Sequence, residues 1–423
     1  MRLFVAILLG RFFGGLSRLV GRGGSALPGL VAARVDPRLV EKILGETSVV
    51  LITGTNGKTT TTKMVVSVLE SRGKRVVTNP TGSNLERGVA SALLDASSFR
   101  GRIDADVAVF EVDEAAVRSL APRLKPAGLA VTNLARDQLD RYGELQTTAG
   151  HVATAATHAG HLVLNADDPL VAGLAGDRPV SWFGGADAIR DRMPDDRSLY
   201  GDQGPDRPSP DAGALVVDSS TDGDGQVATI RIDGTDRRIR LQVPGVYNAY
   251  NAATALLVTG LLGVDAREAV AALEAMAPAF GRGQVLEHQG RRVKILLVKN
   301  PASLNQAIRL LESVAEPSAV LVAINDEHAD GRDVSWLWDA EIERLAGSPH
   351  RFGAGGVRAA DMALRFKYAG IEAWSEEGFR GALDRLVADA AEGETVYLVP
   401  TYTAMLRFLE ILDPKSSRSE AWR

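Results

Sequence analysis

A short glycine-containing run carries the residue types that bind phosphate groups. It reads Gly54, Thr55, Asn56, Gly57, Lys58, Thr59 and Thr60, and it lies between an apolar stretch and a helical pattern. Backbone N–H groups of such a loop, together with those at the start of the next helix, form an anion site. Lys58 adds a positive charge for the β- and γ-phosphates, and the Thr59 hydroxyl can ligate Mg²⁺. The run therefore predicts a site for nucleotide phosphates, although its spacing departs from the usual phosphate loop.

An acidic residue ends another apolar run, at residues 107–111. An acidic side chain at the carboxyl end of a parallel strand faces the same crevice as the phosphate loop. We therefore predict Glu111 as a ligand of Mg²⁺. Asp113 and Glu114 follow it, and they better fit the alternative role of negative charges at the start of a helix.

The elements that must position these residues alternate between strands and helices. Short β-branched runs at residues 49–52, 75–77, 107–110, 129–131 and 162–164 are predicted strands, and the segments between them are long enough for helices. This pattern indicates an α/β fold with a mostly parallel sheet and helices on both faces. A second alternation, with strands at 293–298, 319–324 and 395–399, predicts a smaller Rossmann-like α/β domain at the C-terminus.

The length of 423 residues is too great for one ordinary domain. We expect an N-terminal helical segment over residues 1–46, packed on a central nucleotide-binding domain over residues 47–285, and a C-terminal domain over residues 286–423. Within the central domain, residues 184–225 hold ten Asp and four Arg and few apolar residues, which predicts a solvated loop or disordered insertion. A hairpin is expected from Val227 to Val243, followed by helices.

Composition excludes several classes of site. The chain has no cysteine, which removes disulfides, cysteine-ligated zinc and a cysteine nucleophile of its own. A pI near 5.8 argues against nucleic acid as the main partner.

The first residues leave two alternatives open. The apolar run at residues 3–9 is too short to span a bilayer and is flanked by arginines. It fits a helix packed on the domain or a basic amphipathic helix that touches anionic lipid. The nucleotide motif belongs in the cytosol, so we expect a cytoplasmic protein. The second alternative would add peripheral contact with the inner face of the membrane.

Four motifs in order resemble the Mur ligase superfamily. The phosphate loop is the first, and the others are residues 133–140, 245–253 and 280–283. The resemblance implies an ATP-dependent ligase in which Lys58 and Thr59 hold phosphates and Mg²⁺. It also implies that Asn248 or Asn251 contacts adenine and that Arg282 reaches the phosphates from across the cleft. Gln138 stands where the amino-acid-adding members have histidine, so that role is not carried over.

In two further features the chain resembles the MurT subfamily, whose members are the synthetase subunits of lipid II isoglutaminyl synthase. Only about 50 residues precede the loop, too few for a separate UDP-binding domain, and the segments at 299–306, 324–339 and 400–406 are similar to that subfamily. The resemblance implies ATP-dependent amidation of the α-carboxylate of D-glutamate in lipid II, during peptidoglycan synthesis. Ammonia would come from a GatD-type glutaminase partner that supplies the cysteine nucleophile.

In the resembled complex an aspartate orients the partner's catalytic histidine. We assign that role to Asp339, with Asp333 as the alternative; both also fit a helix cap or a salt bridge in an aspartate-rich loop. Many relatives hold a four-cysteine zinc ribbon, so zinc is predicted to be absent here. The competing hypotheses are a folylpolyglutamate-synthase-like ligase acting on a small soluble substrate and a non-catalytic scaffold gated by ATP.

Overall fold

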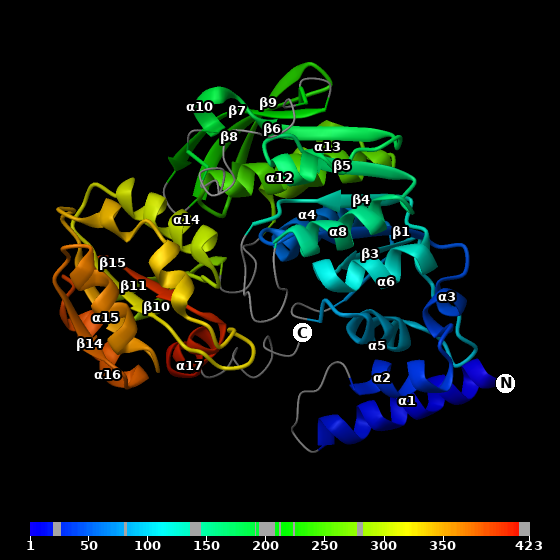
Figure 1. Ribbon diagram of the computed structural model, residues 1–423, viewed down its shortest axis with the longest axis horizontal. Coiled ribbons are helices and arrows are strands. Elements are labelled where there is room, and N and C mark those ends of the chain that lie inside the picture. The colour runs from blue at the N-terminus through cyan, green and yellow to red at the C-terminus, as the bar shows by residue number, and fades with distance from the viewer. Residues whose placement is uncertain are drawn as a thin grey trace.

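The computed structural model describes residues 1–19, 27–79, 83–135, 145–190, 192–193, 208–210, 213–222, 225–276 and 282–413. Within them the chain forms two separate β-sheets, each covered by helices on both faces (Figure 1). This is the α/β architecture that the alternation of strands and helices predicts.

The first sheet has the strand order β2-β3-β1-β4-β5-β6-β7-β8-β9. Neighbours from β2 to β7 run parallel, whereas β7, β8 and β9 pair antiparallel at one edge. The strands are β1 Ser48–Thr53, β2 Val76–Thr78, β3 Val107–Glu111, β4 Gly128–Val131, β5 His161–Asn165, β6 Val180–Gly185, β7 Ala214–Asp222, β8 Gly225–Ile232 and β9 Thr235–Leu241.

Helices cover both faces of this sheet because its strands are apolar on both sides. In β1, Val49 and Leu51 pack on one face, and Val50 and Ile52 pack on the other. The first face is covered by α1 Arg2–Leu19, α2 Leu27–Val35, α3 Leu39–Leu44, α5 Glu86–Ala96, α6 Glu114–Leu124, α8 Leu145–Ala156 and α9 Pro169–Ala172. The second is covered by α4 Lys58–Ser71, α10 Asp187–Arg190, α12 Val246–Leu261 and α13 Ala266–Glu274.

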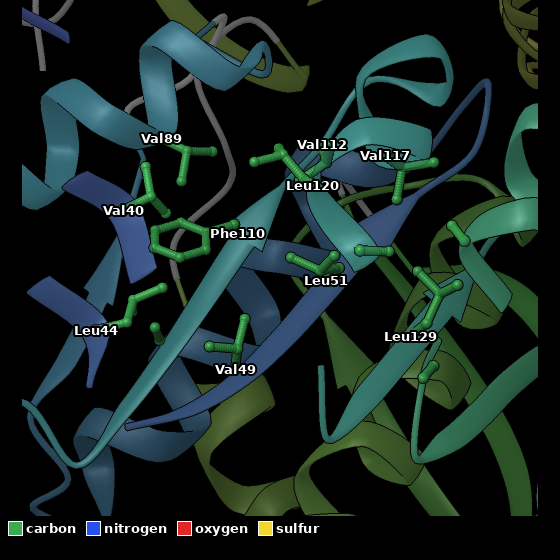
Figure 2. Packing of buried hydrophobic residues seen from close by; sticks show 14 of the residues in the cluster. Val40, Leu44, Val49, Leu51, Val89, Phe110, Val112, Val117, Leu120 and Leu129 are labelled. Carbon is green, nitrogen blue, oxygen red and sulfur yellow. The ribbon is translucent and has the colours of Figure 1, made fainter. Parts of the chain in front are cut away.

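The N-terminal helices share a core with the sheet, as one of the two alternatives for this segment expected. Figure 2 shows the ring of Phe110, on β3, facing Val40 of α3 and Val89 of α5. All three side chains are fully or almost fully buried. Among the described residues, no helix has both the length and the apolarity needed to cross a bilayer.

The second sheet has the order β10-β11-β15-β12-β13-β14, and only β10 runs antiparallel to its neighbour. Its strands are β10 Arg282–His288, β11 Arg291–Leu296, β12 Ala319–Ala323, β13 Arg351–Gly355, β14 Ala373–Glu376 and β15 Thr395–Pro400. One face packs against α14 Pro301–Glu312, α15 Ala359–Tyr368 and the 3-10 turns η1 Ser335–Asp339 and η2 Ile342–Leu345. The other packs against α16 Phe379–Ala388 and α17 Tyr402–Leu412.

Two expectations about segment boundaries need correction. The acidic segment 184–225 contains regular structure, because α10 and the strand β7 lie inside it. The apolar start of β7 is buried and pairs with β8, which outweighs the acidic composition around it. The expected domain boundary after residue 285 falls inside β10; since β10 pairs with β11, the second unit begins no later than residue 282. The predicted hairpin is confirmed as β8 and β9.

Candidate active site at the carboxyl ends of the central strands

The strand ends of the first sheet bring the predicted phosphate loop beside two other segments. β1 lies between β3 and β4, and all three run parallel. Their register aligns Ile52 with Glu111 and Thr53 with Val131, so the three carboxyl ends lie at one edge. The helix after β1, α4, packs on one face of the sheet, whereas the helix after its neighbour β3, α6, packs on the other, which is the arrangement that forms a ligand crevice in open α/β sheets.

The phosphate loop connects β1 to α4, and two glycines give it its shape. Gly54 has φ +126° and Gly57 has φ +89°, values that side-chain-bearing residues rarely adopt. A Cβ on Gly57 would lie 2.3 Å from Oδ1 of Asn251. No side chain caps α4, which starts at Lys58, so the start of this helix presents backbone N–H groups of the kind that bind phosphate.

The segment after β4 holds this loop in place. The Oδ1 of Asn133 accepts a hydrogen bond from the backbone N–H of Asn56 at 2.9 Å, and its Nδ2 donates to the Asn56 carbonyl. The Thr132 hydroxyl donates to the same carbonyl at 2.7 Å, and Thr55 exchanges two hydrogen bonds with the backbone of Ala135. The motif at residues 133–140 therefore begins as a brace for the loop; residues 136–140, including Gln138, lie outside the described residues.

Lys58 is buried beneath the loop and forms an ion pair. Its Nζ lies 3.1 Å from Oε2 of Glu114, and it also donates to the Gly54 carbonyl. Both side chains are more than nine-tenths buried. The lysine charge is balanced by the Glu114 carboxylate, so a bound phosphate would compete with Glu114 for it.

The two predicted Mg²⁺ ligands, Glu111 and Thr59, lie at the carboxyl end of β3 and in the first turn of α4. The Glu111 backbone is fixed by two 2.9 Å hydrogen bonds with the amide of Asn79. Its side chain is buried, and within the described residues its carboxylate receives no hydrogen bond. A buried carboxylate without such donors suits a cation, and the Thr59 hydroxyl stands in the first turn of α4. The described residues contain no group of three or more His, Cys, Asp or Glu side chains arranged for a metal.

Of the two acidic residues expected to stabilise the start of a helix, Asp113 does so and Glu114 has a different partner. Asp113 caps α6, because its carboxylate accepts from the N–H of Ala115 at 3.1 Å. Glu114 is instead the partner of Lys58. The sequence did not reveal this pairing, since it depends on where α6 lies relative to the loop.

Asn248 and Asn251 lie under the phosphate loop, at the start of α12. The Nδ2 of Asn251 donates to Oδ1 of Asn248 at 3.1 Å, and Asn248 in turn donates to the Pro244 carbonyl. The Thr61 hydroxyl, on α4, donates to Oδ1 of Asn251. Both asparagines are buried, and together they tie α12 to α4; contact of either with adenine stays a prediction.

The run at residues 165–168 contributes residues that sequence reasoning missed. Asn165 donates to the Thr132 carbonyl at 2.9 Å, and Asp168 accepts from the N–H of Leu134 at 2.6 Å. Asp167 accepts from the Tyr250 hydroxyl at 2.7 Å. The available signal was a polar cluster directly after the apolar strand β5, at the same sheet edge as the phosphate loop.

The second sheet also turns a carboxyl edge toward the loop. Asn300, which caps α14 after β11, donates from Nδ2 to Oδ1 of Asn56 at 3.2 Å. The two residues are 244 positions apart, so this bond joins the two sheet domains. Arg282 starts β10, but its side chain lies outside the described part of the chain, and its role toward phosphate stays a prediction.

A polar cluster follows β12 and β15 on the same edge. Asp330 accepts from the N–H of Thr403 at 2.8 Å and from its hydroxyl. Burial raises the pKa of Asp330 above its ordinary value, against the opposing effect of the Thr403 hydrogen bonds. Burial, with the nearby charge of Asp330, also raises the pKa of Tyr402.

The two aspartates assigned to the partner's triad differ in their surroundings. Asp333 is half-buried, and its carboxylate accepts from the N–H of Ser335 at 2.8 Å, which starts η1. Asp339 is exposed at the end of η1. The buried Arg365 fixes the backbone on both sides of Asp339, because it donates to the carbonyls of Leu337 at 3.0 Å and Ala340 at 2.7 Å.

Comparisons with known proteins agree with this architecture. A family model of the Mur ligase middle domain matches residues 52–259, and a model of the MurT ligase C-terminal region matches residues 297–405. The chain resembles the solved MurF from Acinetobacter baumannii with a TM-score of 0.68 at 18% identity, covering 93% of this chain and 80% of the other. It resembles MurF from Thermotoga maritima in complex with ADP with a TM-score of 0.67 at 20% identity, covering 90% and 84%. These likenesses show the Mur ligase fold.

Two curated relatives are similar over nearly the whole chain. The lipid II isoglutaminyl synthase (glutamine-hydrolyzing) subunit MurT of Streptococcus pneumoniae strain R6 is 31% identical over 94% of each chain. The protein of the same name from Staphylococcus aureus strain COL is 29% identical over 88% of this chain and 89% of its own. The chain therefore belongs to the MurT family of Mur-type ligases, and it is a ligase subunit.

Proposed function

We propose that this chain activates the α-carboxylate of D-glutamate in the stem peptide of lipid II with ATP and converts it to the amide, giving D-isoglutamine. The observation that carries the proposal is the full-length similarity to MurT subunits together with the match of residues 297–405 to the MurT C-terminal family. The first explains a Mur-type nucleotide site, and the second distinguishes this chain from amino-acid-adding Mur ligases.

ATP would bind at the carboxyl edge of the first sheet. The loop from Gly54 to Thr60 would receive the β- and γ-phosphates on backbone N–H groups, and Lys58 would leave Glu114 to contact them. Thr59 and Glu111 would hold Mg²⁺, which neutralises the charge that develops on the phosphates. Arg282 would approach from the second domain, and Asn248 or Asn251 would contact adenine.

Activation replaces a poor leaving group with a good one. The α-carboxylate attacks the γ-phosphorus of ATP, ADP departs, and an acyl phosphate remains. Ammonia then attacks the acyl carbon, loses a proton, and displaces inorganic phosphate to leave the amide. The protein's task is to hold two anions together and offset their repulsion, which the charge of Lys58 and the N-terminus of α4 would do.

Ammonia would come from a GatD-type glutaminase subunit that binds the C-terminal domain. The proposal assigns Asp339 to orient the catalytic histidine of that partner. Support comes from its exposure at the end of η1 and from the clamp by Arg365. Asp333, whose carboxylate accepts a hydrogen bond from the N–H of Ser335, is the alternative.

Two other functions make different demands. A folylpolyglutamate-synthase-like ligase would act on a small substrate alone, and it would not explain the match to the MurT C-terminal family. An ATP-gated scaffold would not need the buried carboxylate of Glu111 beside the loop. Absence of zinc remains a prediction, and stoichiometric zinc in the purified protein would contradict it.

The test mixes the chain with the partner glutaminase, lipid II, ATP, Mg²⁺ and glutamine labelled with heavy nitrogen at its amide. We expect label in the stem peptide and one ADP per amide formed. Lys58→Ala should abolish both while the complex with the partner stays intact. Asp339→Asn should abolish glutamine-dependent amidation, and free ammonium should restore it; failure of ammonium would remove Asp339 from the proposed role.

A further inference from the structure

The helix α1 exposes an unusually apolar face. Ala6, Ile7 and Gly10 are buried against the domain, whereas several large apolar side chains point outward. The exposed large residues are Met1, Phe4, Val5, Leu8, Leu9, Phe12 and Leu16. Their spacing of three to four residues places them along one side of the helix. A surface helix normally shows the opposite arrangement, with polar residues outward.

The inward side of α1 is firmly packed, so the outward side is a defined surface. A Cβ on Gly10 would lie 2.8 Å from Leu94 and 3.1 Å from Ala32, which shows how closely α1 approaches α5 and α2. Arg11 donates to the carbonyls of Leu94 and Ser97, and its guanidinium carbon lies 4.5 Å from the centre of the Phe99 ring. Figure 1 shows α1 with α2 at the outer margin of the central domain, beyond α5.

Two more apolar side chains extend this surface. Phe99 follows α5 and is 53% exposed, and Leu27 at the start of α2 is 40% exposed. A group of exposed large apolar side chains on neighbouring elements indicates an interaction site. We call the exposed side chains of α1, together with Leu27 and Phe99, the α1 surface.

The charge of the N-terminal sequence segment that contains α1 indicates what the α1 surface would contact. The first 35 residues hold five arginines and no acidic residue, giving +5, whereas the whole chain carries −5. An apolar helix face beside an excess of arginine is typical of a helix that lies in the interface of an anionic membrane. The acidic remainder would be repelled from the same lipids, so the charge asymmetry also orients the molecule.

We propose that the α1 surface inserts into the headgroup region of an anionic lipid bilayer and holds the enzyme at the membrane. The biological purpose of this membrane contact rests on the proposed function, since lipid II is a membrane lipid. The helix would lie in the plane of the interface, because α1 and α2 pack side by side on the domain. Apolar burial supplies affinity, and the arginines add attraction that depends on anionic lipid.

The experiment measures flotation of the full chain with vesicles of phosphatidylcholine alone and of phosphatidylcholine mixed equally with phosphatidylglycerol. We expect flotation with the anionic vesicles and little with the neutral ones. Leu8→Ser combined with Phe12→Ser should lower vesicle binding by roughly tenfold or more, because two exposed apolar side chains are lost. The matched control is Val357→Ser with Leu364→Ser, which are exposed on the C-terminal domain and should bind like the wild type.

Thermal unfolding of both double variants establishes that they fold. Wild-type protein that does not float with anionic vesicles, or an α1 variant that floats as well as wild type, would overturn the proposal. A dimer that the α1 variant converts to a monomer, with vesicle binding unchanged, would assign the α1 surface to a second copy of the chain instead.

Amidation of a water-soluble stem-peptide analogue, with the partner present, separates the membrane proposal from the proposed function. The α1 variant should retain it, and its absence in the wild type would refute the proposed function without affecting the flotation result.

Discussion

At the scale of single residues, two glutamates three positions apart take different tasks. Glu114 pairs with Lys58, whereas Glu111 presents a buried carboxylate that the described residues leave without a hydrogen-bond donor. The positions of the phosphate loop, Lys58 and Glu111 at the strand ends could be predicted from the sequence, because they depend on neighbours in the chain; their roles toward ATP and Mg²⁺ stay predictions. The Glu114 pairing and the contacts of Asp167 and Asp168 could not, since they depend on how separate elements pack.

Magnesium dependence separates the two glutamates. With Glu111→Gln, we expect the Mg²⁺ concentration for half-maximal ATP turnover to rise at least about tenfold, because a charged ligand is lost. Glu114→Gln should leave that concentration near the wild-type value. The measurement is a magnesium titration of ADP release in the assembled complex, and equal shifts in the two variants would contradict the assignment of Glu111.

Asp330 should make stability depend on pH in a defined direction. Its pKa is raised in the folded state, so the folded protein binds this proton more tightly than the unfolded chain does. The stabilisation is complete below the ordinary aspartate pKa, and it is lost as pH rises through the folded pKa. The difference in free energy of unfolding between wild type and Asp330→Asn should therefore shift against the wild type as pH rises above the ordinary aspartate pKa of about 4. Urea unfolding at several pH values measures it, and a constant difference would contradict the raised pKa.

At the scale of elements, the two ends of α4 contrast in what they require of glycine. A Cβ on Gly57, before the helix, would meet Asn251, whereas a Cβ on Gly73, just after the helix, would meet nothing within 4 Å. Helix and strand positions followed from periodicity, and α12 and α13 follow the hairpin as the sequence predicted. The strand β7 was not predicted, because its pairing with β8 outweighs the acidic composition of the segment.

Substitution of Gly57 should therefore affect ATP binding, whereas substitution of Gly73 should affect only stability. Gly57→Ala should abolish ATP binding, because the new methyl group would clash with Asn251 and deform the loop. Gly73→Ala, also at positive φ, should cost only about 1–2 kcal/mol of stability and leave binding intact. Calorimetric titration with ATP tests this, and normal ATP affinity in Gly57→Ala would contradict the account of the loop.

Arg365 makes a second prediction at this scale. It is buried and bonds two carbonyls of the η1 segment as well as Glu343. Arg365→Ala should lower the free energy of unfolding by about 3 kcal/mol, since buried acceptors lose their donor. Arg358→Ala, which removes a more exposed pair with Asp326, should cost less than about 1 kcal/mol. Chemical denaturation of both variants measures the two losses, and equal losses would contradict the clamp.

At the scale of the whole molecule, two sheet domains meet at the phosphate loop. Both α/β units could be predicted from the alternation of strands and helices. Their mutual placement could not, because the 3.2 Å bond between Asn56 and Asn300 joins residues 244 positions apart. The start of the second unit was also misplaced, since β10 pairs within the second sheet.

The contact between domains should affect nucleotide binding. Asn300→Asp keeps the oxygen that caps α14 but loses the Nδ2 donor to Asn56. We expect a raised KM for ATP with an unchanged unfolding temperature, because the domains close less tightly over the loop. Asn300→Ala should lower both the stability and the ATP affinity. An unchanged KM in Asn300→Asp would show that the contact does not contribute to the site.

The central claim is ATP-dependent amidation of the lipid II stem peptide by this chain. Mass spectrometry of lipid II after incubation with the chain, its glutaminase partner, ATP, Mg²⁺ and labelled glutamine tests that claim most directly. The account predicts heavy nitrogen in the α-amide of D-glutamate with wild-type protein and none with Lys58→Ala. Unmodified lipid II in the presence of a folded, partner-bound wild-type chain would contradict it.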